Sequence, residues 1–209
     1  THIDRLRDAV VGVPTAWHAR GAGERPLKIT TFEEHARQID TAAAIGSAII
    51  SVHDIGAAVT NTMVGDDLAL ARRVVEYAED RGVLLALETG DFEACLKAVE
   101  LLPGLRICLD PAYINSHSDR SLGEYIAAFD DRICYLHLYD DSFEGGHITP
   151  GTGDVPLEDW MLLLRWMRRT EFRGPAVFEI HPPPQKVGQT ALEAVVEARQ
   201  YMEELAPPP

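Results

Sequence analysis

Long apolar runs, cysteines and basic residues are all scarce in this sequence. No stretch of about 18 apolar residues occurs, so we expect no membrane-spanning helix. Three cysteines without C-x-x-C spacing, and polar opening residues that do not form a signal peptide, predict a reducing, cytoplasmic location. Lysine and arginine number 19 against 33 aspartates and glutamates, giving a net charge of −14. This charge repels polyanions and argues against nucleic-acid binding.

The pattern along the chain is typical of a globular α/β protein. The 209 residues suffice for one domain, residues 1–209, with a sizeable core. Six short apolar runs alternate with amphipathic helical patterns, which predicts βα units around a parallel sheet. We favour a (β/α)8 TIM-barrel type over a doubly wound open sheet. An open sheet concentrates its ligand at one switch point, whereas polar residues here end all six predicted strands.

Four of the apolar runs end in a carboxylate or an imidazole. They are Glu88 in LLALETGD, Asp110 in RICLDPAY, His137 in ICYLHLYDD and Glu179 in AVFEIHPPP. Such runs indicate strands buried on both faces, where a charge at the end is costly unless it is paired. If the four groups converge at a barrel mouth, they suit one divalent metal: Mn²⁺, Mg²⁺ or Co²⁺, with Zn²⁺ as a further option. The alternative is four separately satisfied polar strand ends.

Four histidines are candidate substrate contacts. His18 and His53 end the first two predicted strands and could contact substrate or metal, or be ordinary polar strand termini. His147 lies in the glycine-rich loop DSFEGGHITPGTGDV, and His181 lies just beyond the last predicted strand. His147 could reach the site when that loop folds over it, and a solvated loop histidine is the alternative for this residue.

Other signals concern the helices and loops. Three capping boxes, starting at Thr31, Ser121 and Thr190, predict helix starts. The stretch PAYINSHSDR, which contains Tyr113, is interpreted as a polar loop. Asp140 in HLYD either orients a neighbouring ligand or caps a turn.

With these residues in place, the chain resembles the xylose isomerase-like TIM-barrel superfamily of sugar phosphate isomerases and epimerases, which is related to endonuclease IV-type enzymes. The matching pieces are Glu88, LDPAY with Asp110, HLYDD with His137, HITPGTGDV and FEI with Glu179. The resemblance implies that these four residues bind the metal and that the two glutamates form an acid–base pair. It also implies that the first two barrel strands are absent here. Preceding residues or a partner chain, as in a homo-oligomer, would then cover the edge at VPTAWHA.

Two positions depart from the family pattern. Tyr113 stands where many members have a substrate-contacting histidine. Gly145 stands where the repair nucleases have a metal-binding aspartate. Together with the acidic charge, these differences argue against a nuclease.

The sequence therefore predicts a divalent-metal-dependent sugar (phosphate) isomerase or epimerase. It would remove a proton next to a carbonyl and pass through a metal-stabilised enediolate. The alternatives are a metal-dependent dehydratase of a polyol or keto-acid and a non-catalytic barrel protein. The expected partner is a small sugar or polyol, without nucleic acid or membrane.

Overall fold

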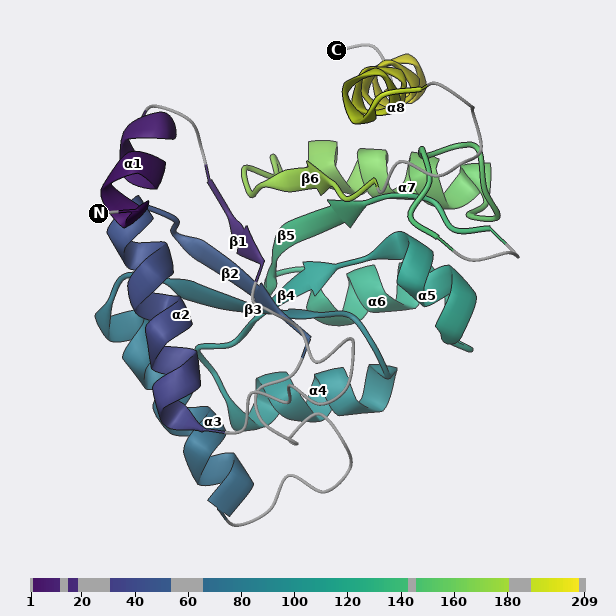
Figure 1. The fold of residues 1–209 in the computed structure, drawn as a ribbon. Helices are drawn as coiled ribbons and strands as arrows, with labels where there is room; N and C mark the ends of the chain where they lie inside the picture. The colour runs from purple at the N-terminus through teal and green to yellow at the C-terminus, as the bar shows by residue number, and fades with distance from the viewer. Residues whose placement is uncertain are drawn as a thin grey trace. The chain divides into compact units, whose positions relative to one another are not determined.

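The computed structural model describes residues 2–11, 15–18, 31–53, 66–142, 146–180 and 189–206. Within them, strands and helices alternate along most of the chain. The six described strands are hydrogen-bonded in the order β1-β2-β3-β4-β5-β6, and every pair whose register is defined is parallel (Figure 1). The fold is thus an α/β fold of the TIM-barrel type with six described strands in place of eight, and the prediction of an incomplete barrel is confirmed.

Two compact units, defined by their internal contacts, make up the chain. Unit 1 comprises Thr1–Cys108 and Arg132–Tyr135. Unit 2 comprises Leu109–Asp131 and Leu136–Pro209. The prediction of one domain over residues 1–209 stays a prediction.

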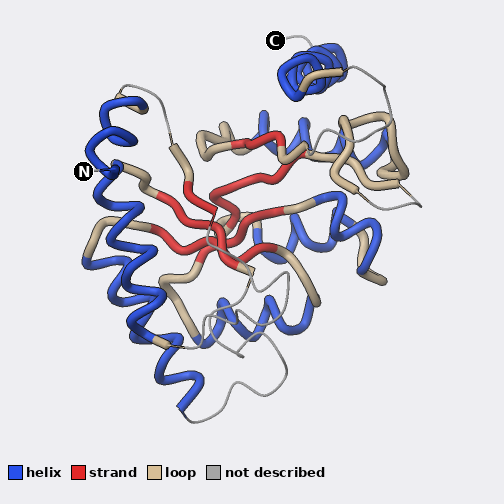
Figure 2. Tube along the Cα trace, viewed as in Figure 1, coloured by secondary structure: helices blue, strands red, loops and turns tan. Residues whose placement is uncertain are grey.

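Unit 1 holds the first strands and their covering helices. Its elements are α1 (His2–Ala9), β1 (Trp17–His18), α2 (Phe32–Ile45), β2 (Ile49–Val52), α3 (Asp66–Asp80), β3 (Leu84–Glu88), α4 (Phe92–Leu101) and most of β4 (Arg106–Leu109). Helices α2 and α3 lie side by side and pack against β2 and β3 (Figure 1 and Figure 2). Asp40 on α2 joins them, because its carboxylate accepts hydrogen bonds from Tyr77 Oη and Arg81 Nε, both at 3.0 Å.

The core of unit 1 contains one buried residue from each of four successive strands, β2 to β5. This core layer consists of Ile49, Ala86, Cys108 and Tyr135. Cys134 packs against the layer, and burial raises the pKa of its thiol to about 12. Burial likewise raises the pKa of Cys95 to about 11. Both thiols therefore stay protonated near neutral pH and pack as small apolar side chains.

Unit 2 holds the second half of the chain. Its elements are α5 (Pro111–His117), α6 (Leu122–Phe129), the end of β5 (Ile133–Leu138), α7 (Leu157–Arg169), β6 (Ala176–Phe178) and α8 (Ala191–Leu205). Strands β5 and β6 pair in parallel, with His137 opposite Val177. Across the described residues of both units, every helix is too short or too polar to span a bilayer.

The interpretation of PAYINSHSDR as a polar loop is wrong, because Pro111–His117 forms helix α5. Asp110 is the N-cap residue, and its Oδ1 accepts the backbone N–H of Tyr113 at 2.9 Å. Pro111 occupies the first turn, where its missing N–H has no helical partner to lose. The Asp-Pro pair therefore starts a helix in spite of the polar composition that follows.

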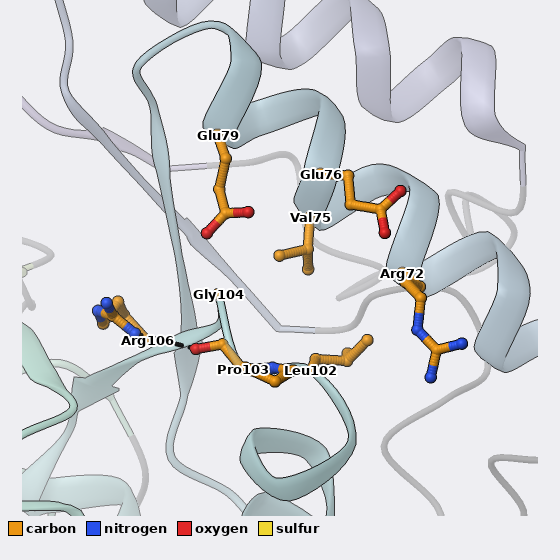
Figure 3. Close-up of a pocket in the computed structure, with 8 residues that line it drawn as sticks. All are labelled: Arg72, Val75, Glu76, Glu79, Leu102, Pro103, Gly104 and Arg106. Atoms are coloured by element: carbon orange, nitrogen blue, oxygen red, sulfur yellow. Dashed lines mark hydrogen bonds between the residues drawn. The ribbon is translucent and has the colours of Figure 1, made fainter.

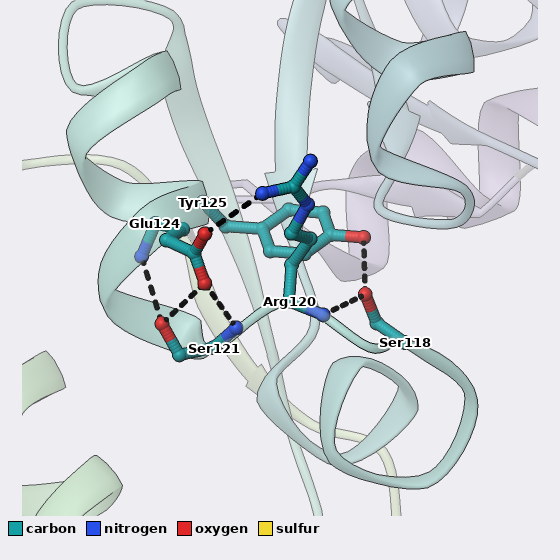
Figure 4. Close-up of polar contacts among 5 residues, drawn as sticks. All are labelled: Ser118, Arg120, Ser121, Glu124 and Tyr125. Carbon is teal, nitrogen blue, oxygen red and sulfur yellow. Dashed lines mark hydrogen bonds and ion pairs between the residues drawn. The ribbon is translucent and has the colours of Figure 1, made fainter.

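The connection from α5 to α6 is held by a compact set of polar contacts (Figure 4). Ser121 and Glu124 form the predicted capping box. Ser118 Oγ accepts the backbone N–H of Arg120 at 3.1 Å and lies 3.1 Å from Tyr125 Oη. Arg120 also contacts Glu124 Oε1 at 3.1 Å. These contacts fix the C-terminal end of α5, the helix that Asp110 begins.

Candidate metal centre

Three of the four predicted metal ligands come together within unit 2. His137 Nδ1 lies 3.2 Å from Glu179 Oε2 and 3.9 Å from Asp110 Oδ2. His137 lies within β5, Asp110 directly follows β4, and Glu179 directly follows β6. All three therefore occupy carboxyl ends of strands, where TIM-barrel enzymes carry their active sites.

The geometry and chemistry of this cluster fit a divalent cation. One ligand atom from each of the three residues lies within 4.8 Å of the others. Ligand atoms that share one ion at roughly 2.0–2.6 Å lie roughly 3–5 Å from one another, as these do. Asp110 and His137 are buried, whereas the Glu179 side chain is 24% exposed and can be reached by a substrate. Two carboxylates and one imidazole suit Mn²⁺, Mg²⁺, Co²⁺ or Zn²⁺.

The fourth predicted ligand, Glu88, lies in a second cluster within unit 1. Its Oε2 is 3.2 Å from His53 Nδ1 and 3.7 Å from His18 Nε2. The two imidazole rings are 4.9 Å apart and tilted by 54°. The Glu88 side chain is only 8% exposed, whereas that of His53 is 45% exposed. The structure thus brings both predicted histidines within ion-pair distance of one nearly buried carboxylate.

Asp140 anchors the glycine-rich loop. It is fully buried, and its carboxylate accepts backbone N–H groups of Asp141 at 3.0 Å, Gly151 at 2.9 Å and Val155 at 2.9 Å. Burial raises the pKa of Asp140, while these N–H donors oppose that shift. A Cβ on Gly153 would lie less than 3.0 Å from both Asp140 and Asp141, so the loop requires glycine there. Of the two predicted roles for Asp140, the structure supports the turn cap.

Of the remaining predicted substrate contacts, His147 lies beside a predicted metal ligand. His147 reaches Glu179, with its Nδ1 3.1 Å from the Glu179 carbonyl oxygen and 3.9 Å from Oε2. Tyr113 lies on α5, is 38% exposed and stacks on His117 with 4.4 Å between ring centroids. His181 lies outside the described residues.

Unit 1 also has a cavity of about 340 Å³, whose lining includes none of the residues of these clusters (Figure 3). Its lining includes Arg72, Glu76 and Glu79 of α3, together with Gly104 and Arg106 at the start of β4. This end of β4 is the amino-terminal end, opposite the end that Asp110 follows. A Cβ on Gly104 would lie less than 3.0 Å from the carboxyl end of the Glu79 side chain, which would have to move. The amino-terminal face of a TIM barrel generally serves stability.

The chain belongs to the family of xylose isomerase-like TIM barrels, whose family model matches residues 12–205. This confirms the resemblance that the strand-end motifs indicated.

Several solved structures share this fold. An L-ribulose 3-epimerase is similar with a TM-score of 0.73 and 16% identity, over 98% of this chain and 79% of that chain. A xylose isomerase domain protein from Planctomyces limnophilus is similar with a TM-score of 0.71 and 21% identity, over 97% and 84% of the two chains. D-psicose 3-epimerase from Clostridium cellulolyticum H10, solved with D-tagatose, gives a TM-score of 0.71 and 14% identity, over 99% and 84%. None of the curated proteins compared with the chain matches it.

Proposed function

We propose that this chain is a divalent-metal-dependent isomerase or epimerase of small hydroxy-ketone or hydroxy-aldehyde sugars. The observation that carries the proposal is the cluster of Asp110, His137 and Glu179 at strand carboxyl ends, with ligand atoms within 4.8 Å of one another. Similar folds whose names describe sugar 3-epimerases, the L-ribulose and D-psicose enzymes, support this reaction class.

We infer that Glu88 is the fourth ligand. In the register of β3 and β4, Glu88 pairs with Cys108, and the N–H of Thr89 donates to the Cys108 carbonyl at 2.9 Å. Asp110 lies two residues beyond Cys108, and Glu88 lies two residues beyond Ala86, the neighbour of Cys108 in the core layer. Because side chains alternate along a strand, this spacing directs both carboxylates to the face that carries the core layer.

A bound divalent cation would supply a Lewis acid that makes the C–H next to a substrate carbonyl more acidic. Glu179 then accepts that proton at its carboxylate, which is exposed enough to meet the substrate. Glu88, protonated before the reaction, donates its proton to the carbon, and His53 Nδ1 lies 3.2 Å from its Oε2. Return to the opposite face of the carbon inverts its configuration, which is epimerisation. Return by Glu179 to the same face, at the neighbouring carbon, together with transfer of the adjacent hydroxyl proton to the former carbonyl oxygen, gives isomerisation.

The histidines and Tyr113 complete the proposed substrate site. His18 and His53 adjoin Glu88, and His147 adjoins Glu179, so each can hydrogen-bond hydroxyl groups beside a proton-transfer residue. Tyr113 and His181 are proposed as further substrate contacts. The net charge of −14 makes a nucleic-acid substrate unfavourable.

The test is to incubate metal-stripped protein, with and without added Mn²⁺, with a panel of ketoses and aldoses in D₂O. We expect Mn²⁺-dependent incorporation of deuterium at the carbon next to the carbonyl, together with an epimer or isomer of the sugar. Release of a dehydrated product would instead identify a dehydratase. Stoichiometric metal binding without deuterium incorporation into any sugar would contradict the proposal.

The two proton-transfer roles are tested with Glu179→Gln and Glu88→Gln, each with its metal content measured. General acid–base catalysis contributes roughly 10²–10⁴-fold, so either variant should lose at least about a hundredfold in turnover. A variant that keeps its metal and more than about a tenth of wild-type turnover would show that its residue is only a ligand.

A further inference from the structure

We propose that Tyr139 is a positioning residue: it holds the His147 ring where Nδ1 donates its proton to the Glu179 carbonyl, and in this neutral tautomer Nε2 accepts a hydrogen bond from a substrate hydroxyl. That a substrate hydroxyl is the group that donates to Nε2 rests on the proposed function. The tautomer and its dependence on Tyr139 are properties of unit 2 alone.

The plane of the His147 ring is set by stacking on Tyr139. The ring centroids are 3.8 Å apart and the planes differ by 8°. Tyr139 is buried, so it offers a fixed surface. A parallel contact this close leaves the imidazole little room to turn about its Cβ–Cγ bond.

The backbone explains why these two rings meet. The next residue after each ring, Asp140 and Ile148, forms an antiparallel bridge with hydrogen bonds in both directions at 2.8 Å. Tyr139 and His147 are therefore diagonal neighbours across this bridge, a relation within reach of aromatic side chains. The carboxylate of Asp140 then holds the far end of the loop through Gly151 and Val155. The segments that carry the two rings are thus held together by the bridge and by the contacts of the Asp140 carboxylate.

The Glu179 carbonyl determines which nitrogen carries the proton. His147 Nδ1 lies 3.1 Å from this oxygen, and a carbonyl can only accept a hydrogen bond. The Glu179 carboxylate oxygen is 3.9 Å away, which is too far to be the hydrogen-bond partner. A proton on Nε2 alone would instead set the Nδ1 lone pair against the lone pairs of the carbonyl. In the neutral ring, Nδ1 is therefore the donor and Nε2 the acceptor.

An acceptor nitrogen is suited to a sugar hydroxyl. The His147 side chain is 30% exposed, so a ligand can reach it, and it lies beside the carboxylate proposed to move the proton. A hydroxyl that donates to Nε2 would place its carbon near Glu179. Tyr139 would then contribute to substrate binding without touching the substrate.

The tautomer is measured without any substrate. Protein labelled with ¹⁵N-histidine is studied by long-range ¹H–¹⁵N correlation at a pH where the ring is neutral, and the His147 signals are assigned by their loss in His147→Gln. We expect a protonated Nδ1 and a pyridine-like Nε2 in the wild type and in Tyr139→Phe, which keeps the aromatic face. Tyr139→Leu should shift both signals toward a mixture of tautomers.

Tyr113→Leu is the matched control, because it removes a second tyrosine–histidine stack, with His117, from the same unit. It should leave the His147 signals unchanged. A wild-type His147 with its proton on Nε2, or a folded Tyr139→Leu with wild-type signals, would overturn the proposal. If Tyr139→Leu does not fold, the wild-type tautomer still decides.

Activity provides a second, separate reading. With the sugar that the enzyme turns over, Tyr139→Leu should raise KM by up to about tenfold, the effect of one hydrogen bond, with a smaller change in kcat. A change confined to kcat would contradict a binding role. Absence of turnover in every variant would overturn the proposed function and leave the tautomer result standing.

Discussion

Replacing Asp140 with alanine should loosen the loop that carries His147. The Asp140 carboxylate is fully buried and accepts three backbone N–H groups, from Asp141, Gly151 and Val155, at 2.9–3.0 Å. Asp140→Ala removes both carboxylate oxygens, so all three N–H donors lose their acceptor at once. The three N–H groups stay in the loop without their acceptor, and this loss of hydrogen bonds is the main contribution to the fall in stability.

The magnitude follows from the burial of each donor. A hydrogen bond to a charged group contributes roughly 1.5–3 kcal/mol to stability. The bond from Val155 is buried, so its N–H should bear the full penalty, whereas those from Asp141 and Gly151 are partly buried and water can replace the carboxylate there. We therefore expect the free energy of unfolding to fall by about 3–5 kcal/mol. Asp140→Asn keeps one oxygen and should lose about 1–3 kcal/mol.

Urea unfolding followed by circular dichroism measures the change, and amide hydrogen exchange at Gly151 and Val155 locates it. Asp119→Asn is the control, because Asp119 is an exposed carboxylate of the same unit and should change stability by less than about 0.5 kcal/mol. If Asp140→Ala unfolds within about 1 kcal/mol of the wild type, the carboxylate does not hold the loop. Unchanged exchange at Val155 would lead to the same conclusion.

Three further changes test other features. Burial lowers the pKa of His35, so below about pH 6.5 the unfolded chain binds a proton at this residue that the native state does not. As the pH is lowered, the free energy of unfolding should therefore fall more steeply in the wild type than in His35→Leu. Equal slopes in urea unfolding from about pH 7 to 5 would refute this. Gly153→Ala should cost about 1–3 kcal/mol, since its Cβ would press on Asp140, and an unchanged urea midpoint would contradict the contact. Ser121→Ala removes the capping box with Glu124 and should cost about 1 kcal/mol, lowering Tm by about 2–4 °C, with an unchanged Tm as the contrary result.

The strand-end residues could be predicted because their local pattern is strong. Glu88 is the last residue of β3, His137 lies in β5, and Asp110 and Glu179 directly follow β4 and β6. In each case an apolar run gives way abruptly to one polar group, and a parallel sheet brings such ends to one edge. The residue types also indicated a metal, since carboxylate and imidazole together are its common ligands.

Helix α5 could have been predicted from its first residues, but the polar composition of the segment favoured a loop. The polar residues after Asp110 favour a loop by their individual preferences, whereas Asp at the N-cap and Pro111 in the first turn favour a helix. The capping signal prevailed because Asp110 Oδ1 accepts the N–H of Tyr113. A second capping box, Thr190 with Glu193, was predicted correctly from the same kind of signal.

The pairing of Tyr139 with His147 could not be predicted from local pattern. The two residues are separated by a loop whose path depends on the bridge between Asp140 and Ile148. The loop around that bridge is held in turn by the buried Asp140 carboxylate, which accepts the backbone N–H groups of Gly151 and Val155. Contacts of this kind are set by tertiary structure, and the sequence predicted only that Asp140 either caps a helix or turn or orients a ligand.

We propose that His137 binds the metal together with the carboxylates of Glu88, Asp110 and Glu179. The most direct measurement is electron spin echo envelope modulation of Mn²⁺ added to metal-stripped protein, which detects nitrogen bound to the ion. We expect modulation from a single imidazole nitrogen, which is lost in His137→Asn and retained in His18→Asn and His53→Asn. Nitrogen modulation that survives in His137→Asn, or that disappears in either of the other two variants, would contradict it.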